Sequence, residues 1–233
     1  MAKHKVVSRK EWLAARKALL AKEKKFTRAR DQLAQQRRDL PWVKVDKDYI
    51  FDGPDGRQTL GQLFGKKSQL IVYHFMFGPG WEEGCPHCSF WADHYDGMLP
   101  HLGARDASFV VVSRAPLAEI KPFKKRMGWR FKWVSSNRND FNFDFHVSFP
   151  PKDIKSGKVF YNYETGPMPM TDREGISVFF KNKKGDIFHT YSTFARGIDI
   201  VNPTYHFLDL LPKGRDERGR GQFWVRYHDK YKN

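Results

Sequence analysis

Cys85 and Cys88 are the only cysteines among the 233 residues, and two residues separate them. Cysteines this close together do not bridge distant segments, as the disulfides of a secreted framework do. Their spacing suits local redox chemistry, because one thiolate attacks a disulfide and a second thiol then resolves the mixed disulfide. We therefore expect Cys85 to be the nucleophile and Cys88 the resolving cysteine.

The residues around the pair are expected to tune its reactivity. Pro86 suits the first position of a helix, and a helix start favours the thiolate form of Cys85. His87 can donate a hydrogen bond or carry positive charge, which also favours the thiolate. Glu82 and Glu83 act in the opposite direction, because nearby negative charge raises a thiol pKa. The sequence leaves open which influence is stronger.

A Cys-x-x-Cys pair can also be half of a zinc site. The chain has no second cysteine pair and no His-x3–5-His spacing downstream, so a metal site would have to recruit His74 or His94. We expect no metal and no other cofactor, and the alternative set is Cys85, Cys88, His74 and His94. For His74 we expect a hydrogen-bonded place in the core, with a role as proton acceptor for Cys88 as the alternative.

The elements that must position the dithiol follow from the pattern of apolar residues. Residues 69–77 are apolar on both faces, as in a buried central strand, and a Gly-Pro-Gly loop separates them from the cysteines. The segment 89–102 then predicts a helix, 107–113 a second buried strand and 116–127 another helix. Strands that alternate with helices in this way pair in parallel through right-handed crossovers.

The second half of the chain predicts an antiparallel hairpin followed by a helix. Its strands are expected over 176–180 and 186–191, with a turn at 182–185, and the helix over 202–211. The resulting order, βαβα followed by ββα without an internal repeat, is typical of a thioredoxin-type core. The sequence therefore predicts an α/β fold, a thioredoxin-like mixed sheet flanked by helices.

A basic helical extension is expected to precede this core. Ser8 and Glu11 have the spacing of a capping box, so a helix should start there, and Pro41 should end it. Thr27 is a position where the segment could divide into two helices. We accordingly divide the chain into an extension (1–40), a thioredoxin-like domain (41–212) and a basic, aromatic C-terminal tail packed on or beside the core (213–233).

The formal net charge is +16, and basic residues crowd the N-terminal segment. We interpret this charge as a solvated helix face through which an acidic partner could bind; we do not expect nucleic acid, because charge alone is weak evidence. The first ten residues lack the apolar core of a signal peptide, and the apolar run 70–77 is too short to span a bilayer as a helix. We therefore expect a cytoplasmic protein without a membrane span.

Several motifs carry a resemblance to a known family. They are the segments 73–79 and 81–89 around the dithiol, together with 111–116, 127–129, 133–136, 189–192 and 195–197. The chain from about Lys10 to Asp229 resembles the bacterial family of predicted dithiol-disulfide oxidoreductases of unknown function. The resemblance implies a thioredoxin-like fold related to peroxiredoxins. It also implies a loop and short helix at 140–145, where alternation alone predicts a strand.

The sequence departs from thioredoxin-like oxidoreductases at the substrate loop. Those enzymes usually place a cis-proline before the strand that faces the dithiol, whereas Arg173, Glu174 and Gly175 precede Ile176 here. Gly175 would allow a close backbone approach and Arg173 would offer charge. We take Arg173, Gly175 and Ile176 as the candidate substrate loop, with a simple turn before the hairpin as the alternative.

The predicted function is a thiol-disulfide oxidoreductase that acts on a protein or small-molecule disulfide, or on an oxidant, and is regenerated by a thiol reductant. One alternative is a thiol peroxidase, in which Cys85 forms a sulfenic acid that Cys88 resolves. Gly78 and Glu82, however, stand where the peroxidatic motif Pro-x3-Thr/Ser-x2-Cys has its proline and hydroxyl residue. The other alternative is a metal-binding or non-catalytic binding module on a thioredoxin-like scaffold.

Overall fold

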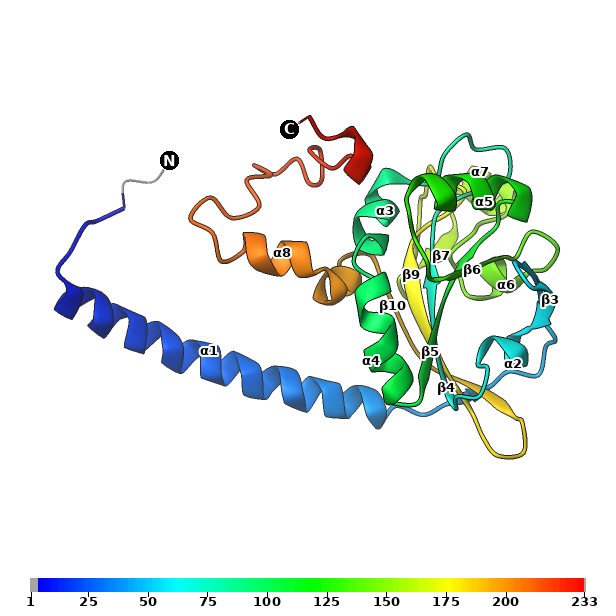
Figure 1. The fold of residues 1–233 in the computed structure, drawn as a ribbon, viewed down its shortest axis with the longest axis horizontal. Coiled ribbons are helices and arrows are strands. Elements are labelled where there is room, and N and C mark those ends of the chain that lie inside the picture. Colours follow the sequence, from blue (N-terminus) through cyan, green and yellow to red (C-terminus); the bar gives the residue numbers. More distant parts are fainter. Residues whose placement is uncertain (1–3, 233) are drawn as a thin grey trace. The chain divides into compact units, whose positions relative to one another are not determined.

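The computed structural model describes residues 4–232, which divide between Pro41 and Trp42 into two compact units (Figure 1). The first unit contains a single helix, α1 (Arg9–Arg38), and the second contains all of the strands described below. Among the described helices, α1 included, none combines the length and the apolar character needed to cross a membrane.

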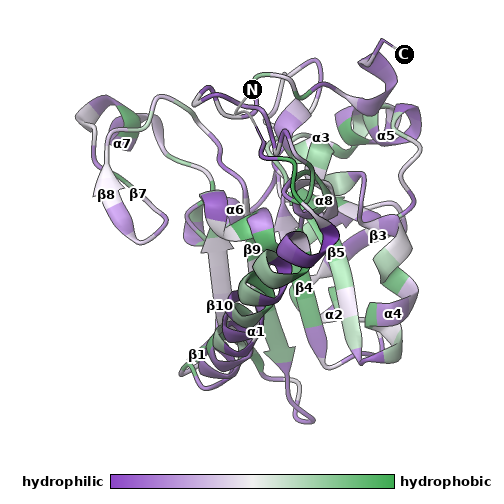
Figure 2. Cartoon of the chain, turned by 90° about the vertical axis from the view of Figure 1, so that its left-hand side faces the viewer, coloured by the Kyte–Doolittle hydropathy of each residue, from purple (hydrophilic) through white to green (hydrophobic). Residues whose placement is uncertain are grey.

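Helix α1 begins at the predicted capping box. The Ser8 hydroxyl accepts the Glu11 N–H, and the Glu11 carboxylate accepts the Ser8 N–H at 3.0 Å. The expected division at Thr27 is wrong, because its hydroxyl donates to the Glu23 carbonyl one turn earlier and the helix continues. Hydrophilic residues are distributed along the whole length of α1 (Figure 2).

The second unit is built on an eight-stranded mixed sheet within residues 42–232, in the order β1-β10-β9-β4-β5-β6-β2-β3. A separate antiparallel pair joins β7 and β8. The strands are β1 (Val43–Lys44), β2 (Ile50–Gly53), β3 (Gly56–Thr59), β4 (Gln69–His74), β5 (Ala107–Ser113), β6 (Lys132–Ser135), β7 (Val159–Tyr161), β8 (Glu164–Gly166), β9 (Gly175–Lys181) and β10 (Ile187–Phe194).

Helices connect and cover these strands. They are α2 (Leu60–Leu63), α3 (Pro86–Ala92), α4 (Leu99–Ala104), α5 (Leu117–Arg126), α6 (Phe141–Asp144), α7 (Pro151–Ser156) and α8 (Pro203–Leu208), with 3-10 turns η1 (Asp96–Met98), η2 (Ala195–Val201) and η3 (His228–Lys230). The thioredoxin-like mixed sheet flanked by helices is confirmed. The single helix expected over 89–102 is wrong, because α3, η1 and α4 occupy that part of the chain.

Strand β4 lies at the centre of the sheet. It pairs in parallel with β5 and antiparallel with β9, so that Tyr73 lies opposite Val111 and Ile176. Because successive side chains of a strand point to opposite faces, Tyr73 and His74 face different layers. Tyr73 belongs to the layer covered by α3, α5 and α8, whereas α2 and α6 cover the other face.

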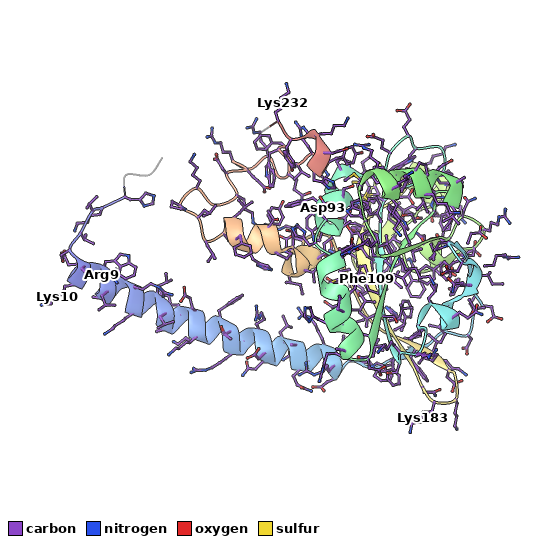
Figure 3. All side chains as sticks on the ribbon, viewed as in Figure 1. Arg9, Lys10, Asp93, Phe109, Lys183 and Lys232 are labelled. Atoms are coloured by element: carbon purple, nitrogen blue, oxygen red, sulfur yellow. The ribbon has the colours of Figure 1, made fainter. Side chains whose placement is uncertain are left out.

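The core of the second unit is strongly aromatic. Phe109 lies within its dense interior, and Lys183 lies at the tip of the β9–β10 hairpin (Figure 3). At 141–144 the chain forms helix α6, as the family resemblance implied, and the strand expected from alternation is wrong. Phe141 of this helix is fully buried and packs edge-on against Phe51 and Tyr49, so tertiary packing decides its conformation.

Candidate active site

The dithiol lies at the N-terminus of α3, directly after the central strand. Cys85 is the N-cap residue, and Pro86 is the first residue of the helix. The Cys85 N–H donates to the Met76 carbonyl at 2.9 Å, and the Met76 N–H donates to the Sγ of Cys88 at 3.4 Å. The backbone of Met76, a single residue in the segment after β4, therefore holds both cysteines in place.

The two thiols, both free, differ in burial and in acidity. Cys88 is 2% exposed, whereas Cys85 is partly exposed. Hydrogen bonds from the Cys88 side chain, from His87 and from the Cys88 N–H hold the pKa of Cys85 well below its usual range, although burial opposes them. Burial, together with the hydrogen bond to Cys85, raises the pKa of Cys88 well above its usual range.

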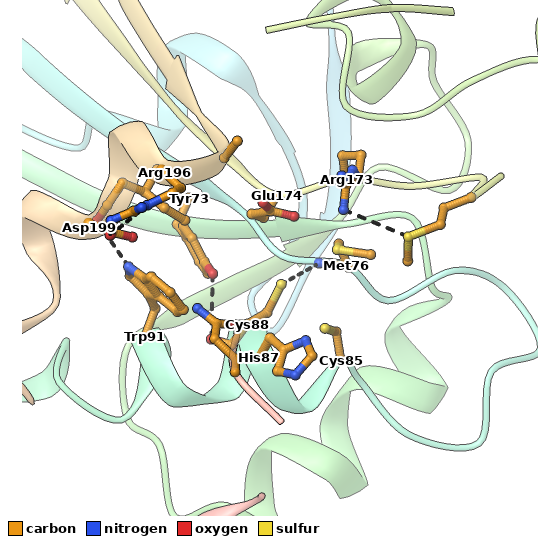
Figure 4. A pocket seen from close by; sticks show the side chains of 14 residues that line it. Tyr73, Met76, Cys85, His87, Cys88, Trp91, Arg173, Glu174, Arg196 and Asp199 are labelled. Atoms are coloured by element: carbon orange, nitrogen blue, oxygen red, sulfur yellow. Dashed lines mark hydrogen bonds and ion pairs between the residues drawn. The ribbon is translucent and has the colours of Figure 1, made fainter. Parts of the chain in front are cut away.

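His87 lies beside Cys85, and both line the same cavity (Figure 4). The hydrogen bond to Cys85 raises the pKa of His87, so the histidine is more readily protonated beside the thiolate. Glu83 pairs with Arg126, and Glu82 is exposed. The carboxylate whose charge raises the pKa of Cys88 is Glu174 from the loop before β9.

A cavity of about 400 Å³ opens at the two sulfurs. Its walls come from the end of β4, from α3, from the loop before β9, from η2 and from the C-terminal segment. Its lining residues are Tyr73, Met76, Cys85, His87, Cys88, Trp91, Met170, Arg173, Glu174, Ala195, Arg196, Ile198, Asp199 and Gln222. Figure 4 shows Arg173 and Glu174 on the side of the cavity opposite His87.

Of the three residues of the candidate substrate loop, only Arg173 lies at the dithiol cavity. Arg173 lines the cavity, whereas Gly175 and Ile176 belong to β9, and Ile176 is 8% exposed within the core. A Cβ atom at Gly175 would lie 2.4 Å from the Phe194 ring. The close approach that Gly175 permits is therefore to Phe194 inside the protein, and the structure gives this glycine a packing role.

A buried ion pair anchors the loop that carries Arg173 and Glu174. Asp172 is 2% exposed and accepts from Arg114 Nε at 2.8 Å and Nη2 at 2.7 Å. The Ser148 hydroxyl donates to the same carboxylate at 2.6 Å. The loop is thus fixed by charge-assisted hydrogen bonds, and residues 4–232 contain no cis peptide bond.

The alternative metal set is not brought together. His74 is fully buried on the sheet face opposite Tyr73, where its Nε2 lies 2.8 Å from the Ser177 hydroxyl. His94 Nε2 lies 2.7 Å from the Thr204 hydroxyl. Across residues 4–232 no cluster of three or more His, Cys, Asp or Glu side chains could hold a metal ion.

The expected hydrogen-bonded core place of His74 is therefore found, and its alternative role as proton acceptor for Cys88 is wrong. The sheet separates the two side chains, because Cys88 packs in the layer of Tyr73. Burial lowers the pKa of His74 to about 3, so the ring is neutral near neutral pH.

Comparison with known proteins places the chain in a family. A family model described as "Bacterial protein of unknown function (DUF899)" matches residues 1–231. The chain belongs to this family. No curated protein matches it.

Among solved structures, the chain is similar to several peroxiredoxins. Peroxidoxin BcpB from Mycobacterium tuberculosis is 13% identical, with a TM-score of 0.47 over 71% of this chain and 95% of that one. Peroxiredoxin Q from Xanthomonas campestris is 13% identical, with a TM-score of 0.48 over 67% and 86%. A mutant of PrxQ from Xylella fastidiosa is 13% identical, with a TM-score of 0.46 over 71% and 95%.

Several residues of the site were not singled out from the sequence. Met76 binds both cysteines through its backbone, which no residue pattern reports. Glu174 adjoins Arg173 in the candidate loop, and this adjacency was the one sequence feature that could have indicated its place at the cavity. Tyr227 donates to the Gly84 carbonyl at 2.7 Å and so braces the dithiol loop from the C-terminal segment, a contact without a local sequence signal.

Proposed function

We propose that this protein is a thiol-disulfide oxidoreductase in which Cys85 attacks a substrate disulfide and Cys88 resolves the product. The observation that supports the proposal is the asymmetry of the two thiols. Cys85 is accessible from the cavity and has a lowered pKa, whereas Cys88 is buried behind it and has a raised pKa. An attacking thiol needs thiolate character and access, and a resolving thiol needs proximity to the first sulfur.

The reaction proceeds in two exchanges. The Cys85 thiolate attacks one sulfur of the substrate, the substrate S–S bond breaks, and the first half leaves as a thiolate that takes a proton from water. Cys88 then attacks the Cys85 sulfur, and the proton that Cys88 loses passes through water to the second half, which leaves as a thiol. Two electrons pass from the dithiol to the substrate, and a Cys85–Cys88 disulfide remains for an external thiol to reduce.

His87 and the helix start serve the first exchange. Because α3 starts at Pro86, the Cys88 N–H lies in the first turn, where it has no acceptor within the helix, and it stabilises the Cys85 sulfur. The paired His87 adds a hydrogen bond to the thiolate. Both effects increase the fraction of Cys85 present as the nucleophile near neutral pH.

The test compares the wild type with Cys88→Ser and Cys85→Ser after treatment with hydroxyethyl disulfide, read by mass spectrometry. We expect an internal Cys85–Cys88 disulfide in the wild type and a stable mixed disulfide on Cys85 in Cys88→Ser. Cys85→Ser should gain no adduct, because Cys88 is buried. A wild type without the internal disulfide, or an adduct that forms as fast on Cys88, would overturn the proposal.

The peroxidase alternative is tested in the same preparation. Hydrogen peroxide replaces the disulfide, and the rate of dithiol oxidation is compared with the rate of peroxide reduction by a free thiol. We expect no acceleration by the protein, because Gly78 and Glu82 replace the proline and hydroxyl of the peroxidatic motif. If the protein reduced peroxide orders of magnitude faster than a free thiol does, peroxide reduction would become the proposed function in place of disulfide exchange.

A further inference from the structure

Arg173 has hydrogen-bond donors that the protein does not use. Its Nε atom is buried beside the dithiol cavity and has no hydrogen-bond partner within residues 4–232. Its Nη1 donates to the Met170 sulfur at 3.7 Å, and a thioether is a weak acceptor. The guanidinium lies over the Tyr161 ring, 5.4 Å from its centroid, and this stacking keeps the group in place.

Two other arginines near the site each pair with a carboxylate, which sets Arg173 apart. Arg114 binds the buried Asp172 with two nitrogens, and Arg196 pairs with Asp199 at 3.2 Å. Arg173 makes no ion pair with a carboxylate in the described chain, although Glu174 is its neighbour. The Glu174 carboxylate instead accepts from the Tyr161 hydroxyl at 3.4 Å.

The chemistry of a free guanidinium defines what it would bind. Its N–H groups match the two oxygens of a carboxylate, and a buried donor without a partner gains most from an anionic acceptor. The cavity, about 400 Å³, has the size of a small-molecule site, and Trp91, Ile198 and Met170 give it apolar walls. These dimensions suit a compact ligand with a short hydrocarbon body.

We infer that the substrate is a low-molecular-weight disulfide with a carboxylate, which binds Arg173 while one of its sulfurs reaches Cys85. This inference rests on the proposed function and specifies its substrate. The Cys85 thiolate breaks the substrate S–S bond, one half becomes the mixed disulfide, and the other leaves as a thiolate that takes a proton from water. Cys88 then displaces the bound half, and Arg173 neither gains nor loses a proton or an electron.

The experiment measures how fast three disulfides oxidise the reduced protein. Dithiodipropionate is anionic, hydroxyethyl disulfide is neutral and cystamine is cationic. Formation of the internal disulfide is followed by rapid acid quench and mass spectrometry. Because a hydrogen bond to a charged group contributes about tenfold to a hundredfold in binding, we expect the wild type to react roughly that much faster with dithiodipropionate than with the neutral disulfide.

Three variants test whether the preference for the anionic disulfide depends on Arg173. Arg173→Gln should lose the preference for the anionic disulfide, and its urea-unfolding midpoint, measured in parallel, reports whether the variant is folded. Arg130→Gln removes the same charge from a side chain that is 83% exposed and outside the cavity, so it should keep the preference. Arg173→Lys keeps the positive charge but lacks the planar guanidinium that can donate two parallel hydrogen bonds to a carboxylate. It should therefore show only part of the wild-type preference for the anionic disulfide.

The outcomes separate the two proposals. Equal wild-type rates with all three disulfides, or an equal loss of preference in Arg173→Gln and Arg130→Gln, would overturn the substrate inference and leave disulfide exchange standing. A preference for cystamine would overturn it as well and would assign the dominant charge to Glu174. Failure of every disulfide to oxidise the dithiol would overturn the proposed function itself.

Discussion

Replacing Arg114 by methionine should destabilise the protein severely, because it leaves the Asp172 carboxylate buried without its counter-charge. Asp172 is 2% exposed, and Arg114 supplies two of its hydrogen bonds, at 2.8 and 2.7 Å. Breaking a buried pair of this kind costs about 3–5 kcal/mol. For a folded unit of this size that corresponds to a fall in Tm of roughly 6–20 °C.

The measurement is urea unfolding followed by tryptophan fluorescence, with scanning calorimetry for Tm. The double variant Arg114→Met with Asp172→Leu removes both charges, so its loss should be smaller than the sum of the single losses. The control Arg138→Gln breaks an exposed pair with Asp52, 3.6 Å long, and should cost less than about 1 kcal/mol. A loss in Arg114→Met as small as in the control would refute the reasoning.

The pH dependence gives a second measurement of the same pair. Burial raises the pKa of Asp172, but hydrogen bonds from Arg114 and Ser148 outweigh it and hold the pKa below the usual 3.8. The pair therefore contributes stability that is fully present above pH 3.8 and is lost as the pH falls through the lower folded pKa. Without Arg114, burial dominates, so acid unfolding should begin at higher pH. Parallel stability curves would contradict this.

Three further predictions concern the thiols and the sheet beside them. Cys88→Ala should move the pH midpoint of Cys85 alkylation by iodoacetamide upward, because it removes the hydrogen bond that lowers this pKa most; an unchanged midpoint would contradict the assignment. His87→Ala should also move it upward, but less, and an effect larger than that of Cys88→Ala would reverse the order of causes. Gly175→Ala should cost about 1–3 kcal/mol in urea unfolding, because the new Cβ meets Phe194 at 2.4 Å; an undiminished midpoint would show that the ring moves freely.

The position of the dithiol was predictable because its determinants are local. The apolar run 69–77 marks the central strand, and Cys85 with Pro86 marks the helix start that follows it. The hairpin of β9 and β10 and the capping box of α1 were predictable for the same reason. Each signal depends on residues within a few positions of one another, so tertiary contacts did not have to be known.

The walls of the cavity were not predictable in this way. Trp91, Arg173 and Gln222 come from segments far apart in the sequence, and only the sheet topology brings them to one place. Tyr227 and Gly84, whose hydrogen bond braces the dithiol loop, are 143 positions apart. Such contacts depend on the path of the whole chain, for which composition and periodicity carry no information.

His74 shows a different kind of limit. Its place in the apolar run correctly predicted burial and a hydrogen bond, but adjacency to the strand end did not decide which face its side chain occupies. Alternation along β4 puts it opposite Tyr73 and away from Cys88. A residue near an active site in sequence can therefore be separated from it by the sheet itself.

The backbone contact of Met76 makes the segment just after β4 a reporter of the redox state of the dithiol. Its N–H donates to the Cys88 sulfur at 3.4 Å, and a sulfur shared in a disulfide is a poorer acceptor than a thiol or thiolate. The amide resonance of Met76 should shift when the dithiol is oxidised, even though this residue contributes no reacting atom. A single backbone signal could thus be used to titrate the dithiol against a redox buffer without labelling either cysteine.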